Sequence, residues 1–211
     1  MKARKVKGID ADGAAADEVA KIVAVRLDEL CGFMPAARDP AALTTLHDMR
    51  IAAKRLRYVL ELFPPSFGPY AAEAAKKVKK LQDLLGEIHD CDATRPLVAA
   101  LGEELREQDA RALRDLAGDA KDLDPALVAQ VPHRAAYRGL QTLDVSLQAR
   151  RGLLFARFLE RWEKLERQGF RAHLEEAVAQ RPGATGLMTS RSHEGNGARP
   201  PDGLPSREPS A

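Results

Sequence analysis

The chain has 211 residues, 45% of them hydrophobic, and a formal net charge of only +2. This length and apolar content can form one domain with a real core, whereas the small net charge excludes a polycation. Two cysteines, Cys31 and Cys91, exclude a disulfide framework and fit a reducing compartment.

The chain is expected to lack an export signal and a membrane span. Its basic start, MKARKVKG, leads into DADGAAADE instead of an apolar stretch, and no window approaches about eighteen uncharged apolar residues. The sequence therefore predicts a cytoplasmic protein with no membrane partner.

Prolines and apolar spacing divide the chain into helices. The first is predicted over about residues 17–33. Asp39 and Pro40 then resemble an N-cap and a first helical position, so a second helix is expected from Pro40 to Phe63. Further helices are predicted over about residues 66–89, 92–116, 125–151 with a restart at Pro132, and 153–179.

The fold class predicted from these elements is all-α. No stretch alternates with the period of two that strands require, and a helical bundle over residues 1–180 follows. From Arg181 the sequence is rich in Gly, Pro and Ser and poor in apolar groups. Because such a segment buries too little surface to offset its ordering entropy, residues 181–211 are predicted to be a disordered C-terminal tail.

The stretch HDMRIAAKRLRY, residues 47–58, gives the second helix a basic face. At about 100° per residue, Arg50, Lys54 and Arg57 fall within about 80° of His47. Tyr58 lies in the same sector, and the apolar residues cluster on the opposite side. Arg55 sits apart, on a flank.

Two later helices also carry aligned cations. Lys76, Lys79 and Lys80 gather on one side of the third helix, and residues 47–80 contain eight Lys+Arg and three Asp+Glu, a local charge of 8 − 3 = +5. In the last segment the aligned cations are Arg150, Arg157, Arg161, Lys164 and Arg171.

The pattern alone leaves two interpretations open, an ordinary solvated face and an anion site. Solvated helix faces usually mix signs, because Glu–Lys pairs four residues apart stabilise a helix. Arginine presents a planar fork of donors that matches phosphate oxygens, and a tyrosine such as Tyr58 adds a hydroxyl donor. The anion that best suits cations spaced one turn apart on a rigid helix is a linear one.

The order of residues adds a family resemblance. HDMRIAAKRLRYVLELF followed by KVKKLQDLLGEIHDCD resembles the CHAD family, the conserved histidine α-helical domain. The first matching block is H-x-x-R-x-x-x-K-R-x-R-Y from His47 to Tyr58. The second block matches at Lys79, Leu81, Gln82, Leu85, Gly86 and Asp90. Weaker similarity extends over about residues 1–180.

This resemblance implies a compact helical bundle of two related four-helix halves around a central basic groove. It also implies that the chain binds inorganic polyphosphate without catalysis or a cofactor, with association with polyphosphate granules and polyphosphate-metabolising enzymes as further expectations. No second H-x-x-R block marks the second half. The site expected to bind polyphosphate is His47, Arg50, Lys54, Arg57, Tyr58, Lys76, Lys79, Lys80, Arg157 and Arg161.

Two other functions compete with this prediction. His47-Asp48 and His89-Asp90 are the dipeptides used by metal-dependent phosphohydrolases of the HD type, which would act on polyphosphate or nucleotides, but no further ligands follow at the required spacing. Non-specific binding of nucleic acid also uses basic helices. Base contacts usually need exposed aromatic residues, which are expected here on apolar faces, so nucleic acid is the less favoured partner. No metal site is expected.

Overall fold

The computed structural model describes residues 2–63 and 67–180, all of whose regular elements are helical. These are α1 (Ala15–Cys31), α2 (Met34–Ala37), α3 (Leu43–Leu62), α4 (Gly68–Ala117), the 3₁₀ helix η2 (Pro125–Gln130), α5 (Arg134–Arg167) and α6 (Phe170–Ala179). The all-α class is confirmed. A division into two related four-helix halves is not shown by these helices, and the predicted tail, residues 181–211, lies outside the described residues.

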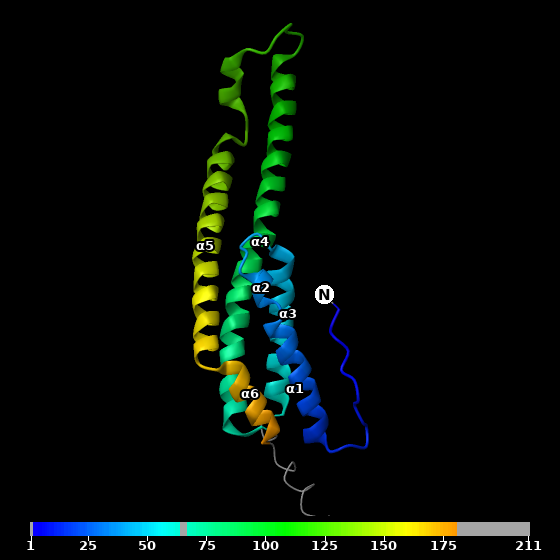
Figure 1. Ribbon diagram of the computed structural model, residues 1–211. Helices are drawn as coiled ribbons and strands as arrows, with labels where there is room; N and C mark the ends of the chain where they lie inside the picture. Colours follow the sequence, from blue (N-terminus) through cyan, green and yellow to red (C-terminus); the bar gives the residue numbers. More distant parts are fainter. Residues whose placement is uncertain (1, 64–66, 181–211) are drawn as a thin grey trace, which may run out of the picture.

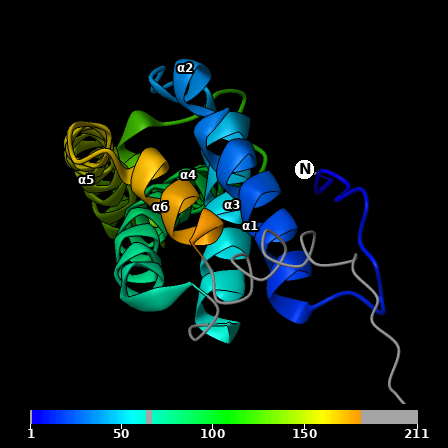
Figure 2. The same cartoon turned by 60° about the horizontal axis from the view of Figure 1, so that its bottom comes forward.

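The core lies in the lower half of the molecule as drawn in Figure 1. The α4 helix runs between α3 and α5 and packs against both of them, while α6 packs against α1, α4 and α5 (Figure 2). The apolar faces of these helices meet there, and Phe155, Phe158 and Trp162 are buried as the sequence predicts.

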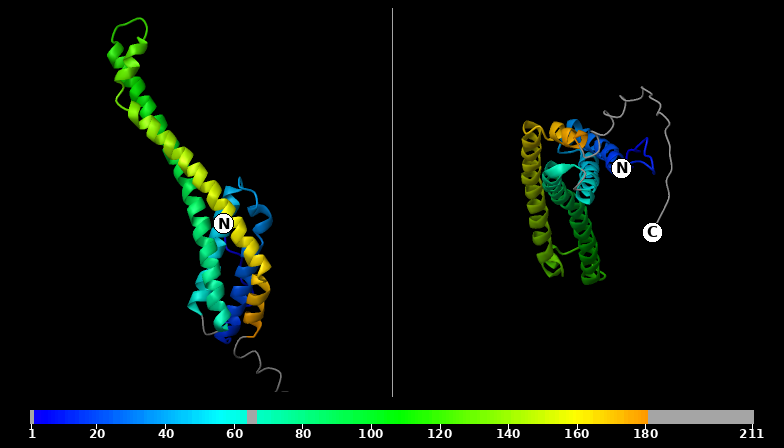
Figure 3. Two further views of the ribbon diagram at one scale, coloured as in Figure 1. Left: turned by 90° about the vertical axis from the view of Figure 1, so that its left-hand side faces the viewer. Right: turned by 90° about the horizontal axis from the view of Figure 1, so that it is seen from below.

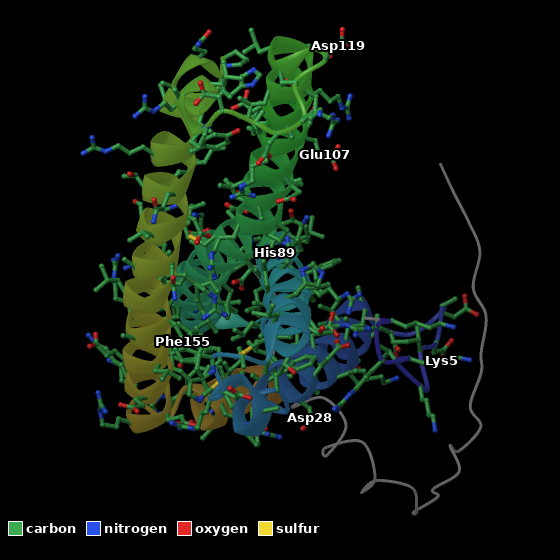
Figure 4. The ribbon with its side chains drawn as sticks, turned by 90° about the horizontal axis from the view of Figure 1, so that it is seen from above. Lys5, Asp28, His89, Glu107, Asp119 and Phe155 are labelled. Carbon is green, nitrogen blue, oxygen red and sulfur yellow. The ribbon has the colours of Figure 1, made fainter. Side chains whose placement is uncertain are left out.

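In their upper parts, α4 and α5 continue beyond the other helices as a long two-helix arm (Figures 1 and 3). Figure 4 labels Glu107 and Asp119 along this arm and His89 nearer to the bundle. None of the described helices has the combination of length and apolarity that a membrane span requires.

Several helix boundaries differ from the predictions. The helices expected over residues 66–89 and 92–116 are one helix, α4, because no glycine or proline interrupts residues 89–92 and Cys91 continues the buried face. Pro96 lies within α4 and removes only one backbone donor. Likewise α5 runs without interruption past Gly152.

The start of α3 and the break between α5 and α6 also differ from the prediction. Asp39 accepts a hydrogen bond from the Ala41 amide in a turn, and α3 begins only at Leu43. The segment predicted as one helix over 153–179 breaks at Gly169, whose φ of 61° is a left-handed conformation that favours glycine. Asp124 is the N-cap of η2, where its side chain accepts a hydrogen bond from the Ala126 amide.

The arm is held together near its tip by a buried carboxylate. Asp109 of α4 is 4% exposed and accepts hydrogen bonds from the Tyr137 hydroxyl at 2.5 Å and the His133 amide at 3.2 Å, with the His133 ring at 2.8 Å. Burial opposes ionisation of this carboxyl, but these hydrogen bonds outweigh burial and hold its pKa below the usual value. The resulting stabilisation is present above the usual Asp pKa and is lost as the pH falls through the lowered pKa.

We expect Asp109→Ala to loosen the end of the arm and leave the bundle unchanged. The substitution removes the shared acceptor of Tyr137 and His133, so amides of residues 131–140 should exchange hydrogen faster. Hydrogen–deuterium exchange by mass spectrometry measures this, with Asp115→Ala, an exposed position on the same helix, as the control. Unchanged exchange in the Asp109 variant would contradict this account of the arm.

The Cys31 thiol is predicted to be unreactive. Burial raises its pKa to about 11. At about pH 8 the reactive thiolate would then be roughly one molecule in a thousand, against about one in four for a free cysteine. Alkylation by iodoacetamide should therefore be at least about a hundredfold slower than for free cysteine, and should accelerate as the pH approaches that pKa. A rate equal to that of the urea-unfolded chain would show that the thiol is accessible and ionised.

Candidate functional site

The two motif blocks of the sequence meet along the contact between α3 and α4. The rings of His47 and His89 lie side by side with their centroids 4.8 Å apart. About one turn along α3 from His47, the Arg50 side chain passes over Gly86 of α4, where an added Cβ would lie 3.6 Å from Arg50 Nε. Gly86 therefore leaves room for Arg50 to lie close against α4.

Polar atoms along this contact are buried and unsatisfied. His47 Nδ1, Arg50 Nε, Arg57 Nε and Gln82 Oε1 have no hydrogen-bond partner among residues 2–63 and 67–180. The Glu61 carboxylate lies 3.6 Å from Arg57 Nε, which is an ion-pair contact outside hydrogen-bond distance. Because buried polar groups are almost always paired in folded proteins, this line of atoms indicates hydrogen-bonding capacity left for water or a ligand.

Tyr58 holds two of the cations in place. The residue is 44% exposed, and Arg57 Cζ lies 4.7 Å and Lys54 Nζ 5.6 Å from the centroid of its ring. Such cation–π contacts contribute about 0.5–1 kcal/mol at exposed sites. An aromatic ring thus positions both cations. Lys54 has no carboxylate partner in the described chain, so its charge is not neutralised there.

The lysines of α4 differ in their partners. Lys79 forms an ion pair with Asp83 at 2.8 Å, and Lys77 pairs with Glu73 at 2.8 Å and lies over the Tyr70 ring. Lys76 and Lys80 are exposed and make no ion pair with the described residues. Two of the three lysines predicted for the site are therefore available to an external anion, and Lys79 shares its charge with a carboxylate.

An ion pair between α4 and α5 shows which side of these helices the remaining cations occupy. Arg150 Nη2 lies 2.6 Å from Glu87 Oε2, so both side chains are on the same side of the two helices. Seven residues are about two helical turns, which places Lys80 below Glu87 and Arg157 below Arg150 on that side. Lys76 and Arg161 follow one turn further along.

The predicted cations of three helices are thus brought to one side of the molecule. Gly86, beside α3, and Glu87, beside α5, are consecutive residues of α4, and the α4 lysines lie on the sector between these two contacts. We call this region the basic surface; it comprises Arg50, Lys54 and Arg57 of α3, Lys76, Lys79 and Lys80 of α4, and Arg157 and Arg161 of α5, with His47 and Tyr58 at its edge. A central groove containing them is not shown.

The opposite side of α4 and α5 is neutralised internally. There Arg95 pairs with Asp144 at 2.7 Å and Arg151 pairs with Asp92 at 2.5 Å. These pairs line a cavity of about 1100 Å³. In contrast, Arg50, Arg157 and Arg161 on the basic surface have no carboxylate partner in the described chain. The two sides therefore differ in how many cations are free to meet an anion.

One cation of the first motif block and one of the aligned cations of the last segment have structural roles. Arg55 reaches Glu29 of α1, with 3.4 Å between Nη1 and Oε1, as expected from its place on a flank of α3. Arg171, which was aligned with Arg157 on the assumption of one continuous helix, belongs instead to α6 beyond the Gly169 break. It pairs there with Asp28 and Glu175.

The sequence also pointed to residues that the predicted site omitted. Gln82, Gly86 and His89 lie along the α3–α4 contact, and the signal for them was the second block, KLQDLLGEIHDCD. His89 is in the middle of α4, so its expected place at a helix end is wrong. Although both His-Asp dipeptides are brought together, no group of three or more His, Cys, Asp or Glu in the described ranges could hold a metal ion.

Comparison with known proteins gives one family. The family model described as CHAD domain matches residues 3–99. The match covers α1 to α3 and the first part of α4, including both blocks, and it ends before Arg157 and Arg161. No curated protein and no solved structure matches the chain.

Proposed function

We propose that this chain, whose residues 3–99 match the CHAD domain family model, binds inorganic polyphosphate on the basic surface and holds it without cleaving it. The observation that carries the proposal is the difference between the two sides of α4 and α5. Cations on one side are matched with carboxylates, whereas most of those on the basic surface are not. An external polyanion would supply the missing charge.

The shape of the basic surface favours a linear anion. Between Lys76 and His89, α4 rises about 20 Å at about 1.5 Å per residue, and cations from α3 and α5 flank it. A compact anion could reach only one or two of these turns, whereas a chain of phosphates can contact all three helices. Arg50 and Arg57 can each offer a fork of donors, and the lysines add mobile charge.

Nucleic acid fits this surface less well. Binding of single strands relies on aromatic rings on which bases stack. Tyr58 is the exposed aromatic residue at the basic surface, and its ring already faces Lys54 and Arg57. Because Phe155, Phe158 and Trp162 are buried, the basic surface offers charge without a stacking platform, which favours a ligand that has no bases.

A competition experiment tests the proposal. A labelled long-chain polyphosphate should be displaced by unlabelled polyphosphate far better than by single-stranded RNA or duplex DNA at physiological salt. Its affinity should fall on the order of a thousandfold between about 50 mM and about 200 mM salt, as for proteins that make about six or more phosphate contacts. Equal competition by RNA would favour nucleic-acid binding instead, and metal-dependent release of orthophosphate would favour the hydrolase.

The proposal extends to where the protein acts. A non-catalytic binding module could attach its chain to polyphosphate granules in the cytoplasm and bring polyphosphate-metabolising enzymes to them. Microscopy of a fluorescent fusion tests this part, because the fusion should colocalise with stained polyphosphate and become diffuse when the basic surface is reversed in charge.

A further inference from the structure

The arm formed by α4 and α5 has almost no core of its own. On α4 beyond Cys91, the buried residues are Val98, Gly102 and Asp109, and on α5 none precedes Leu154. Two helices can bury only the narrow strip between them, so the outer sides of this arm remain open to solvent or to a partner (Figure 3).

Between residues 94 and 112 of α4 and residues 136 and 146 of α5, one side of the arm carries no charge. Counting upward from Glu87 and Arg150 in steps of seven residues, Thr94, Leu101 and Gln108 continue the line of Glu87 as far as the charged Asp115, and Leu143 and Ala136 continue the line of Arg150. Neighbours one turn away complete this side. We call it the uncharged side; it comprises Thr94, Leu97, Leu101, Leu105, Gln108 and Ala112 of α4 and Ala136, Gly139, Leu143 and Ser146 of α5.

Three of the four leucines on this side are exposed, and Leu105 is partly buried. Leu97 is 69% exposed, Leu101 45% and Leu143 43%, in a chain of which 30% of residues are charged. Scattered exposed leucines are ordinary, but a charge-free strip of them along two adjacent helices is typical of a surface that another protein covers.

The composition of the uncharged side points to a second copy of the same chain. Its α4 half is a ridge of leucines, and its α5 half contains the small residues Ala136, Gly139 and Ser146. In a twofold-symmetric dimer each copy contributes the same surface, so the surface must be complementary to itself. A leucine ridge beside a small-residue channel satisfies this requirement when α4 of one copy lies on α5 of the other.

We propose that two copies of this chain dimerise through the uncharged side of the arm, forming a four-helix bundle from two α4–α5 hairpins. About 30 Å of arm, with two helices of about 10 Å diameter each, presents about 600 Å² per copy. The total of about 1,200 Å² lies at the lower end of stable interfaces. Because polyphosphate plays no part in this contact, dimerisation holds or fails independently of the proposed function.

Sedimentation velocity of the full chain without polyphosphate tests the dimer over a concentration series. Wild type should move from the monomer mass of 23.0 kDa to twice that mass. Leu101→Arg, on the uncharged side, should raise the dissociation constant at least about a hundredfold, because it buries an unpaired charge in the interface. Val145→Arg is the matched control, since Val145 is 60% exposed but points away from the uncharged side.

The sedimentation results distinguish a dimer through the uncharged side from the alternatives. Loss of the dimer in Leu101→Arg with retention in Val145→Arg, both with wild-type circular dichroism, supports the proposal. A monomeric wild type at several hundred micromolar would overturn it and leave the uncharged side to a different protein. Equal weakening by both substitutions would also overturn it, because the contact would then lie elsewhere on the arm.

Discussion

Replacing both Arg50 and Lys54 with glutamate is expected to lower the affinity for long-chain polyphosphate by at least about a hundredfold. Each reversal removes a donor and adds a repulsive charge at the centre of the basic surface. Hydrogen bonds to charged groups contribute about 1.5–3 kcal/mol each, so the loss of two amounts to about 3–6 kcal/mol. Since about 1.4 kcal/mol is a factor of ten, isothermal titration calorimetry should detect the loss readily.

The chain provides a matched control for this variant. Arg134 and Arg138 have the same four-residue spacing, are exposed, and make no ion pair with the described residues, but they lie on the arm. Reversing both to glutamate changes the net charge identically and should change affinity only modestly. If both double variants lose affinity equally, binding follows net charge alone, and the basic surface is not the site.

The folded state of the Arg50/Lys54 variant also has to be verified. Lys54 is exposed, and neither cation has a carboxylate partner in the described chain, so helical circular dichroism should match wild type. If the helical signal disappeared together with binding, these residues would support the fold, and their proposed role as ligands would be wrong.

Glu29→Ala is expected to destabilise the protein by about 3–5 kcal/mol. Glu29 is 1% exposed and accepts hydrogen bonds from Arg26 at 2.5 Å, from Arg55 at 3.4 Å and from the Arg4 amide at 3.1 Å. Removing the buried carboxylate leaves Arg26, whose side chain is 11% exposed, without this counter-charge, and breaking a buried pair in this way is strongly destabilising.

Urea denaturation followed by circular dichroism measures this effect. Glu103→Ala is a suitable control, because Glu103 pairs with Arg106 on the exposed surface of the arm and should change stability by no more than about 0.5 kcal/mol. A Glu29 variant as stable as the control would show that the α1–α3 contact does not depend on this carboxylate. Arg55 would then have to be reconsidered as a polyphosphate ligand.

Within single helices, the sequence predicted which cations share a face. Arg50, Lys54 and Arg57 share a face because helical spacing is a local property that the order of residues determines. The apolar side of α4 was equally readable from Val78, Leu81, Leu84, Leu85 and Ile88, of which Leu84 is partly buried and the other four are buried. The CHAD resemblance was carried by the same local blocks, and the family match over residues 3–99 confirms it.

Relations between distant segments were harder to predict. That Arg157 lies on the same side as Lys80 depends on the Arg150–Glu87 pair, which joins residues 63 positions apart. The break at Gly169 and the continuity of α4 through Pro96 depend on tertiary packing, which overrides weak local signals. Arg171 was misplaced for this reason, because its alignment assumed a helix that in fact ends at Arg167.

A crystal structure of the protein with a short polyphosphate would test the central claim most directly. We predict phosphate oxygens within hydrogen-bond distance of Arg50 and Arg57, with the chain continuing along α4 past Lys76 or Lys80 toward Arg157. Phosphates bound instead to the cations of the arm, such as Arg111 and Arg114, with Arg50 and Arg57 left without contact, would contradict the account.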